Sequence, residues 1–472
     1  MSGFSSLNIA SNVLSAHQRA LEVTAQNVAN AATVGYTRQR ADLQSLSATS
    51  VSGLYSTSEG VGEGVSADVV TRIRDAFLER RGQLEHGISA QAAAVDVAWS
   101  QAELSFNEPG SSGLQATLTK QWSAWGQLAT TPTDPAARTA VVAASQAVVS
   151  SLNSTAKALD AQWSSTRVDL QDGLGEVNAA ARQIADLNRA IVASTAGGLD
   201  SNELQDKRDV LIGTLADRIG AIGVPKADGS VDVVVNGAAL VAGKTASQIM
   251  LSAPTAPSGA TTATSALSLA PGGAAVTPGG TMGGQLQAMN EILPGLQGRL
   301  DAVAADVAGR VNAAQQDGST AAGVRGQALF QTESGSTTGI TAGNIRLSGV
   351  SGSGLATGLL DADGNAYASS SGANADRIAQ LGSSTTGPDA TYRDLVTDLG
   401  VKAQSATSSA ASARAIVTQV DASRQSVSGV SLDEEMTNML VFKQSYAAIS
   451  RVITAIDEML DVLINKTGLV GR

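Results

Sequence analysis

Side chains that commonly carry out chemistry are few in this sequence, and their spacing does not build a catalytic group. There is no cysteine, and the histidines are His17 and His86. Thiolate nucleophiles, disulfides, iron–sulfur clusters and zinc sites built on cysteine or on several histidines are therefore excluded. Glu434 and Glu435 are adjacent in a helical pattern, so their carboxylates point in different directions and make a poor acid–base pair. We expect a protein that is not an enzyme.

Two glycine-containing loops match ligand-binding motifs only in part. The run 60–64 contains Gly-Val-Gly, but Val65 stands where a dinucleotide fingerprint needs its third glycine, and no Gly-Lys-Ser/Thr follows. The run 361–365 begins like a calcium loop, but it lacks the glycine at the sixth position and the glutamate at the twelfth. We interpret the first run as a turn or a close backbone approach and the second as a hairpin turn. No cofactor and no metal site is expected.

The charge balance excludes further classes of partner. The formal net charge is −11 and the pI is near 4.8, which is not the electrostatic footprint of a nucleic-acid-binding protein or of a polybasic membrane surface. No run of about 18 apolar residues occurs, so no membrane-spanning helix is expected. The first 23 residues lack the pattern of a cleaved secretory signal. If the protein is exported, we expect another route.

Both ends of the chain carry apolar residues at seven-residue spacing. At the N-terminal end this stripe lies on a helix expected over residues 5–29, and it is thin and rich in alanine, so the helix needs a partner. At the C-terminal end two rows run through several heptads, which is typical of a coiled-coil seam, and Ser431 with Glu434 predicts a capping box at its start. We expect the two helices to pair with each other or with neighbouring copies through Leu7, Leu14, Leu21 and Val28 on the first helix and Leu432, Met439, Phe442, Tyr446, Ile449, Ile453, Ile456, Leu460 and Leu463 on the last.

The sequence between these ends predicts a long helical bundle interrupted by β structure. Only 3% of residues are aromatic, which suits slender bundles better than one thick core. Pro135 begins a long helix capped by Asp134, and a helix over 68–105 is expected to break near Gly87. Turn signals at 228–229 and 236–237 flank a run of valines and predict hairpins. The four tryptophans, Trp99, Trp122, Trp125 and Trp163, lie in the helical part and are expected to pack its core.

The predicted fold class is therefore mainly α with a β-rich insertion: terminal coiled-coil helices, a long multi-helix bundle and an outward β domain. The expected boundaries are 1–66 for the N-terminal helix and its connector, 67–222, 283–316 and 394–428 for the bundle, 223–282 and 317–393 for the β-rich outer domain, and 429–472 for the C-terminal helix.

The residues that follow the first helix resemble a known family. The run 25–39 contains Asn27, Asn30, Gly35 and Tyr36 and resembles the Asn-Asn-Ile-Ala-Asn…Thr-x-Gly-Tyr motif of flagellar rod, hook and hook-associated axial proteins. In physical terms, Asn30 can end the helix, Gly35 permits a bend with positive φ, and Tyr36 can anchor the chain as it leaves. The run 429–465 is similar to the C-terminal helix of the same family. Stretches at 62–78, 134–138 and 204–209 resemble its hook-associated branch, which is rich in helix after the first segment.

This resemblance covers about half of the chain, on both flanks, and implies a function. It implies a structural subunit of the extracellular flagellum, in a ring of about eleven copies that joins hook to filament. The implied partners are further copies of the chain, the hook protein, the next hook-associated junction protein and an export chaperone, with no nucleic acid and no membrane. It also implies type III export without a cleaved signal peptide. The alternatives are a coiled-coil surface adhesin and another axial protein of hook or rod. We also expect the terminal helices to be largely disordered in the free subunit.

Overall fold

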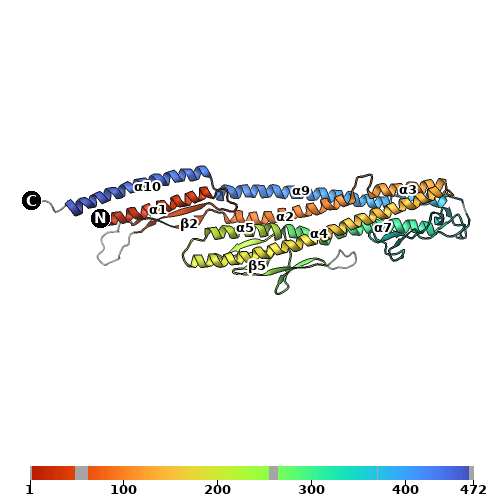
Figure 1. Cartoon of the computed structure of the whole chain (residues 1–472), viewed down its shortest axis with the longest axis horizontal. Helices are drawn as coiled ribbons and strands as arrows, with labels where there is room; N and C mark the ends of the chain where they lie inside the picture. Colours follow the sequence, from red (N-terminus) through yellow and green to blue (C-terminus); the bar gives the residue numbers. More distant parts are fainter. Residues whose placement is uncertain (1–2, 48–61, 255–263, 369, 467–472) are drawn as a thin grey trace, which may run out of the picture.

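The computed structural model describes residues 3–47, 62–254, 264–368 and 370–466 of the chain. Its helices run along one axis, the molecule is long and narrow, and the first and last helices lie together at one end (Figure 1). The predicted fold class is confirmed in its coarse form, as mainly helical with small sheets. The helices are α1 (Gly3–Ala29), α2 (Ala76–Phe106), α3 (Leu114–Thr130), α4 (Pro135–Ala196), α5 (Asn202–Ile219), α6 (Gly280–Gln287), α7 (Leu293–Gln316), α8 (Ala373–Ala379), α9 (Pro388–Ser428) and α10 (Leu432–Asp461).

Helix α4 is the central element of the bundle. It spans 62 residues, begins with Pro135, and is capped by Asp134, whose carboxylate accepts a hydrogen bond from the amide of Ala136 at 2.9 Å. This start was predicted. Apolar residues along α4 pack against α3, α5 and α7, and the predicted aromatic core is present. Trp122, Trp125 and Trp163 are buried and Trp99 is partly buried against them.

Helix α2 is continuous, contrary to the predicted break near Gly87. Gly87 serves close packing instead: a Cβ atom there would lie 3.2 Å from the carbonyl oxygen of Ala216 and 3.2 Å from Cα of Gly220. α5 can therefore approach α2 closely because this position has no side chain. The bundle segment expected to begin at residue 283 starts slightly earlier, with α6, and continues through a π-helical turn (Ala288–Ile292) into α7.

The β structure does not form the single outer domain that we expected. Strands β3 (Ile222–Pro225), β4 (Val231–Val235), β5 (Ala238–Ala242) and β6 (Thr245–Ala246) make one sheet, with the predicted turn at Asn236-Gly237 between β4 and β5. β7 (Gln248–Ser252), β8 (Ala266–Ala270) and β9 (Ala275–Val276) make another. The second insertion forms separate pairs, β10 (Gly318–Ser319) with β13 (Gly358–Leu359) and β11 (Phe330–Thr332) with β12 (Ile345–Leu347).

These small sheets use the helices to complete their cores. Short strands cannot bury enough apolar surface alone, and β5, β6, β7 and β12 each contact α4. In the described part of the chain, no strand of residues 222–276 pairs with a strand of residues 318–359. The insertions therefore belong to the same hydrophobic core as the bundle.

A β hairpin that we did not predict lies beside the first helix. β1 (Gln39–Leu46) pairs antiparallel with β2 (Gly64–Arg72), and both contact α1. The expected boundary at 66/67 falls inside β2. The alternation of apolar and polar side chains is weak because, in the two strands themselves, the buried side chains are only Gln39, Ala67 and Val70. Gly64 has φ +99°, and a Cβ atom there would lie 3.2 Å from the carbonyl oxygen of Ile9, as the close-approach interpretation of this loop requires.

Candidate functional site

The terminal helices α1 and α10 pack against each other in the single chain. Among residues 5–29 of α1, the buried apolar residues are small, namely Ala10, Ala16 and Ala20. Leu7, Leu14, Leu21 and Val28 are only half-buried. On α10, Ile456 is buried and the half-buried residues of the predicted rows are Met439, Phe442, Ile449, Ile453 and Leu460. The seam inside one chain is therefore thin, as its alanine content implied.

Three residues of the predicted rows lie outside this intramolecular seam. Leu432 and Tyr446 of α10 are exposed, and so is Leu463 in the π-helical turn that follows it (Val462–Lys466). The predicted capping box is also absent, because the Ser431 side chain makes no capping hydrogen bond and Glu434 binds Arg38 instead. His17 of α1 stacks obliquely on Phe442, with ring centroids 6.0 Å apart. Burial lowers the pKa of His17.

Asn27 connects the helix, the loop after it and the distant C-terminal helix. Its side chain is 1% exposed. The carboxamide nitrogen donates to the carbonyl oxygen of Gln39 at 2.8 Å and to the carboxylate of Glu435 at 3.0 Å. The carboxamide oxygen accepts from the hydroxyl of Tyr36 at 2.8 Å and from the amide of Gln39 at 3.0 Å. Both ends of the carboxamide are thus used, which only asparagine or glutamine permits.

Tyr36 and Gly35 fix the path of the chain as it leaves α1. Burial, together with the nearby carboxylates of Asp206 and Glu435, raises the pKa of Tyr36 to about 12, so its hydroxyl stays protonated and can donate to Asn27. Gly35 has φ +80°, and a Cβ atom there would lie 2.1 Å from Cγ2 of Val210. The positive φ that we predicted is present, and close packing on α5 is a second reason for glycine.

A carboxylate on α10 completes this group. Glu435 is 2% exposed, and its charge is matched by Arg38, whose Nε donates to it at 2.7 Å, while Nη1 of Arg38 donates to Glu434 at 2.7 Å. The amide of Arg38 also donates to the carbonyl oxygen of Ser428 at the end of α9. A buried carboxylate with both a cation and an amide donor is satisfied, so it locks one arrangement of these elements.

A second polar cluster joins the hairpin to the bundle. Arg72 at the end of β2 donates to Asp206 at 2.7 Å, to Asp209 at 2.9 Å and to Gln205 at 2.7 Å. Arg74 adds a hydrogen bond to Asp209 at 2.6 Å. The motif at 204–209, noted in the sequence as a resemblance, therefore holds the terminal elements on α5.

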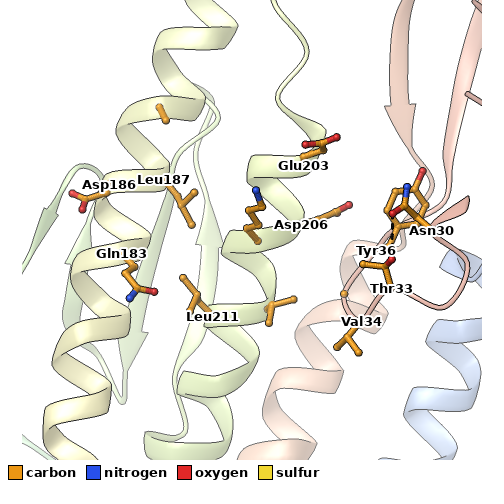
Figure 2. A pocket seen from close by; sticks show the side chains of 14 residues that line it. Asn30, Thr33, Val34, Tyr36, Gln183, Asp186, Leu187, Glu203, Asp206 and Leu211 are labelled. Carbon is orange, nitrogen blue, oxygen red and sulfur yellow. Dashed lines mark hydrogen bonds between the residues drawn. The ribbon is translucent and has the colours of Figure 1, made fainter. Parts of the chain in front are cut away.

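An open groove lies where the loop after α1 meets the bundle. It encloses ≈ 870 Å³ and lies between that loop, α4 and α5 (Figure 2). Its apolar lining residues include Val34, Leu187, Val210 and Leu211. The charged residues that line it are Asp186, Glu203, Asp206 and Lys207.

Sequence reasoning found some members of this site and missed others. Asn27, Gly35 and Tyr36 were predicted as site residues and lie together in the structure. Asn30 was also predicted, but it forms hydrogen bonds only locally, with the Gln26 carbonyl oxygen and the Thr33 hydroxyl. Arg38 and Arg72 lie in the runs 25–39 and 62–78 that carry the resemblance, but the sequence pattern does not mark them as site residues. Their acidic partners lie 396 and 134 residues away, and a single sequence does not reveal such pairs.

Ligand-binding features are scarce in the described ranges. They contain no cluster of three or more His, Asp or Glu side chains that could hold a metal ion. None of the helices in those ranges is long and apolar enough to cross a membrane. The terminal site consists of hydrogen-bonded amide, carboxylate and guanidinium groups that hold distant segments of the chain together.

Comparison with known families gives three matches. Residues 99–330 match the family model described as the flagellar hook-associated protein FlgK helical domain. Residues 7–37 match that of the flagella basal body rod protein, and residues 422–466 match that of the flagellar basal body rod FlgEFG protein C-terminal. The terminal matches cover most of α1 and all of α10, which form the site described above.

Individual relatives agree with these matches. The chain is 30% identical to flagellar hook-associated protein 1 of Bacillus subtilis over 100% of both chains. It is 25% identical to the proteins of that name from Salmonella typhimurium and Escherichia coli, over 97% of this chain and 99% of each relative. The solved flagellar hook junction protein FlgK from Burkholderia pseudomallei superposes with a TM-score of 0.62 at 16% identity, covering 74% of this chain and 100% of that one. The similarity to that structure concerns the fold alone.

Proposed function

Because this chain belongs to the flagellar hook-associated protein 1 family, we propose that it joins the flagellar hook to the filament as one subunit of a ring built through α1 and α10. Membership of the family supports a structural role in the flagellum, an exported assembly, and gives no support to the surface-adhesin alternative. The observation that carries the finer proposal is an uncovered apolar face on α10.

That face flanks the seam with α1. Val441, Val452 and Met459 are 53%, 52% and 59% exposed, and their spacings of 11 and 7 residues place them on one side of a helix with about 3.6 residues per turn. Ile456, which faces the seam, is 6% exposed. Apolar side chains aligned in this way on a secreted protein mark a protein–protein contact. Neighbouring copies would cover them in a ring.

The exposed apolar face of α10 also indicates which parts of the chain take part in assembly. We assign assembly to the terminal elements, α1, β1, β2 and α10, and an outward spacer role to the bundle with its sheets. The hook protein and the next hook-associated junction protein would bind the two ends of the ring. Before assembly the apolar face of α10 needs cover, which is the task we assign to an export chaperone.

Substitution on the outer face of α10 tests the proposal. Val452→Asp and Met459→Asp introduce charge where neighbours would pack, so cells should make hooks without filaments and release flagellin into the medium, as cells lacking the gene would. Ser408→Asp, on the exposed side of α9, is the matched control and should assemble normally. Filaments on cells that lack the chain altogether would contradict the proposal.

A further inference from the structure

We propose that the groove beside Tyr36 receives the first turns of α10 from a neighbouring copy of this chain. The inference rests on the proposed ring and names the two surfaces that meet in it. The groove is the one lined by Val34, Leu187, Val210 and Leu211. The inserted surface, here called the leading stripe, consists of Leu432, Met436 and Leu440.

The leading stripe is separate from both the seam and the outer face of α10. Its three residues follow each other at intervals of four, so they share one side of the helix, and they are 51%, 59% and 58% exposed. Glu435, one residue before Met436, is 2% exposed and points to Asn27. One residue turns a helix by about 100°, so Met436 points well away from the seam.

The groove offers a matching apolar surface. Val34 is 89% exposed and Val210 is 40% exposed, while Leu187 and Leu211 are half-buried beneath them. Figure 2 shows Leu187 and Leu211 between α4 and α5, and Val34 on the loop beyond α5. Exposure as high as that of Val34 is unfavourable for an apolar side chain in water, so a partner that covers it gains free energy.

The two surfaces lie at the same level of the molecule and on opposite flanks. Tyr36 of the groove binds Asn27, which binds Glu435 beside Met436. Across the molecule the order is α10, α1, hairpin, α5, with contacts between α10 and α1 and between α1 and β2, and a hydrogen bond from Asn202 of α5 to Val70 of β2 (Figure 1). A patch on one flank that fits a different patch on the other is what repeated head-to-tail contacts need to close a ring.

Charge is arranged consistently with this pairing. Asp433 lies seven residues before Leu440 and Lys443 lies seven residues after Met436, so the leading stripe has an acid toward one end and a base toward the other. The groove carries Lys207 together with Asp186 and Glu203. Unlike charges can therefore meet in the contact.

A second copy fits this groove better than the hook protein does. Proteins stacked above or below a ring meet the ends of its subunits, whereas the groove lies on a flank. The leading stripe of α10 also supplies apolar side chains that would cover this groove, which is open in the single chain.

Cysteine cross-linking in assembled flagella tests the contact, because the chain has no natural cysteine. Chains carrying Val34→Cys and chains carrying Met436→Cys are produced together and treated with a short bismaleimide. We expect a band of twice the chain mass, and a ladder when both cysteines are on one chain. Val441→Cys, near Met436 but on another side of α10 and 53% exposed, is the matched control and should not link to Val34→Cys.

The outcomes separate this contact from the proposed function. If the chain is present in flagella but Val34→Cys fails to link to Met436→Cys, or links equally to Val441→Cys, the contact is wrong and the ring proposal stands. If the chain is absent from flagella, the proposed function itself is wrong. Met436→Glu should lower incorporation about tenfold, the effect of roughly 1.4 kcal/mol. Unchanged incorporation of that variant would also overturn the contact.

Discussion

The bundle and the terminal elements of this protein are held together by different physical means. The bundle has a continuous core of leucine, isoleucine and valine with buried Trp125 and Trp163. The terminal elements have an alanine-rich seam, and they rely on hydrogen bonds and ion pairs around Asn27, Arg38 and Arg72. Apolar cores tolerate small shifts poorly but do not depend on a few atoms, whereas a polar fastening fails when one partner is removed. The fold of the bundle therefore rests on many apolar contacts, whereas the arrangement of the terminal elements depends on a few polar contacts.

The largest expected effect separates assembly from folding. Ile453→Asp places a charge in the half-buried seam of α10, where a large apolar side chain contributes roughly 1.5–3 kcal/mol. Assembly into flagella should be abolished while thermal unfolding of the bundle is unchanged. Immunoblots of isolated flagella and circular dichroism of the purified chain measure the two effects. Normal incorporation would show that this face of α10 is not needed.

A substitution in the core of the bundle, in contrast to one in the seam, should destabilise the bundle. Trp125 is completely buried, and Trp125→Ala should reduce the free energy of unfolding by about 3–5 kcal/mol, measured by urea denaturation. Trp99→Ala is the control with the same change of side chain, and it should cost less because Trp99 is only partly buried. Equal losses would mean that burial does not distinguish these two sites.

Removal of the Asn27 carboxamide should affect the terminal elements alone. Asn27→Ala leaves the amide of Gln39 and the carboxylate of Glu435 without one of their partners, and each such loss costs about 1–3 kcal/mol. Hydrogen exchange should accelerate in α1, α10 and the hairpin, with no change in α4. Asn8→Ala, at an exposed position of α1, controls for the change in helix propensity.

Hydrogen exchange on the unmodified monomer measures the same difference without substitution. The structure shows α1 and α10 as helices that pack together, but their seam is thin. Most helical stability comes from packing rather than propensity, so amides in α1 and α10 should exchange faster than those in α4. Protection in the ends equal to that in α4 would contradict the expected disorder of the free ends.

The smallest expected effect is a dependence on pH in the bundle near its junction with the terminal elements. His86 of α2 lies between Asp217 of α5 and Asp421 of α9, with its ring nitrogens 3.0 Å from each carboxylate. Arg424, 3.2 Å from Asp421, and Glu79, which binds Arg424 at 2.7 Å, are the neighbouring charges. The hydrogen bond to Asp217 raises the pKa of His86, against the opposing effect of burial, and Asp421 adds to the rise.

The direction of this dependence follows from the raised pKa. The stabilisation is fully present below the unfolded-state pKa of about 6.5 and is lost as the pH rises through the higher folded-state pKa. Proton NMR should therefore find His86 titrating above His17, whose pKa burial lowers. His86→Gln should remove the loss of stability with rising pH. A lower pKa for His86 than for His17 would contradict this.

Particular elements show what the sequence could predict. Helix α4 and its cap followed from Asp134-Pro135 and from apolar periodicity, because those signals are local. The hairpin β1–β2 could not be recognised, since few of its side chains are buried and its function is to carry Arg38 and Arg72 to distant acids. The separate sheets were missed because their cores are completed by α4, which a local pattern does not show. Asn27, Gly35 and Tyr36 were found through a motif, but their partner Glu435 lies 408 residues from Asn27.

The separation of Asn27 and Glu435 along the chain determines when the terminal site can form. The Asn27–Glu435 contact joins the first helix to the last, so the terminal site is complete only in a chain that has been translated through α10. A product truncated before Leu432 can fold its bundle but lacks half of the fastening and all of the outer face. If assembly proceeds through α10 as proposed, such a truncated chain would not join the flagellum, so completeness of the polypeptide would itself be a condition for incorporation.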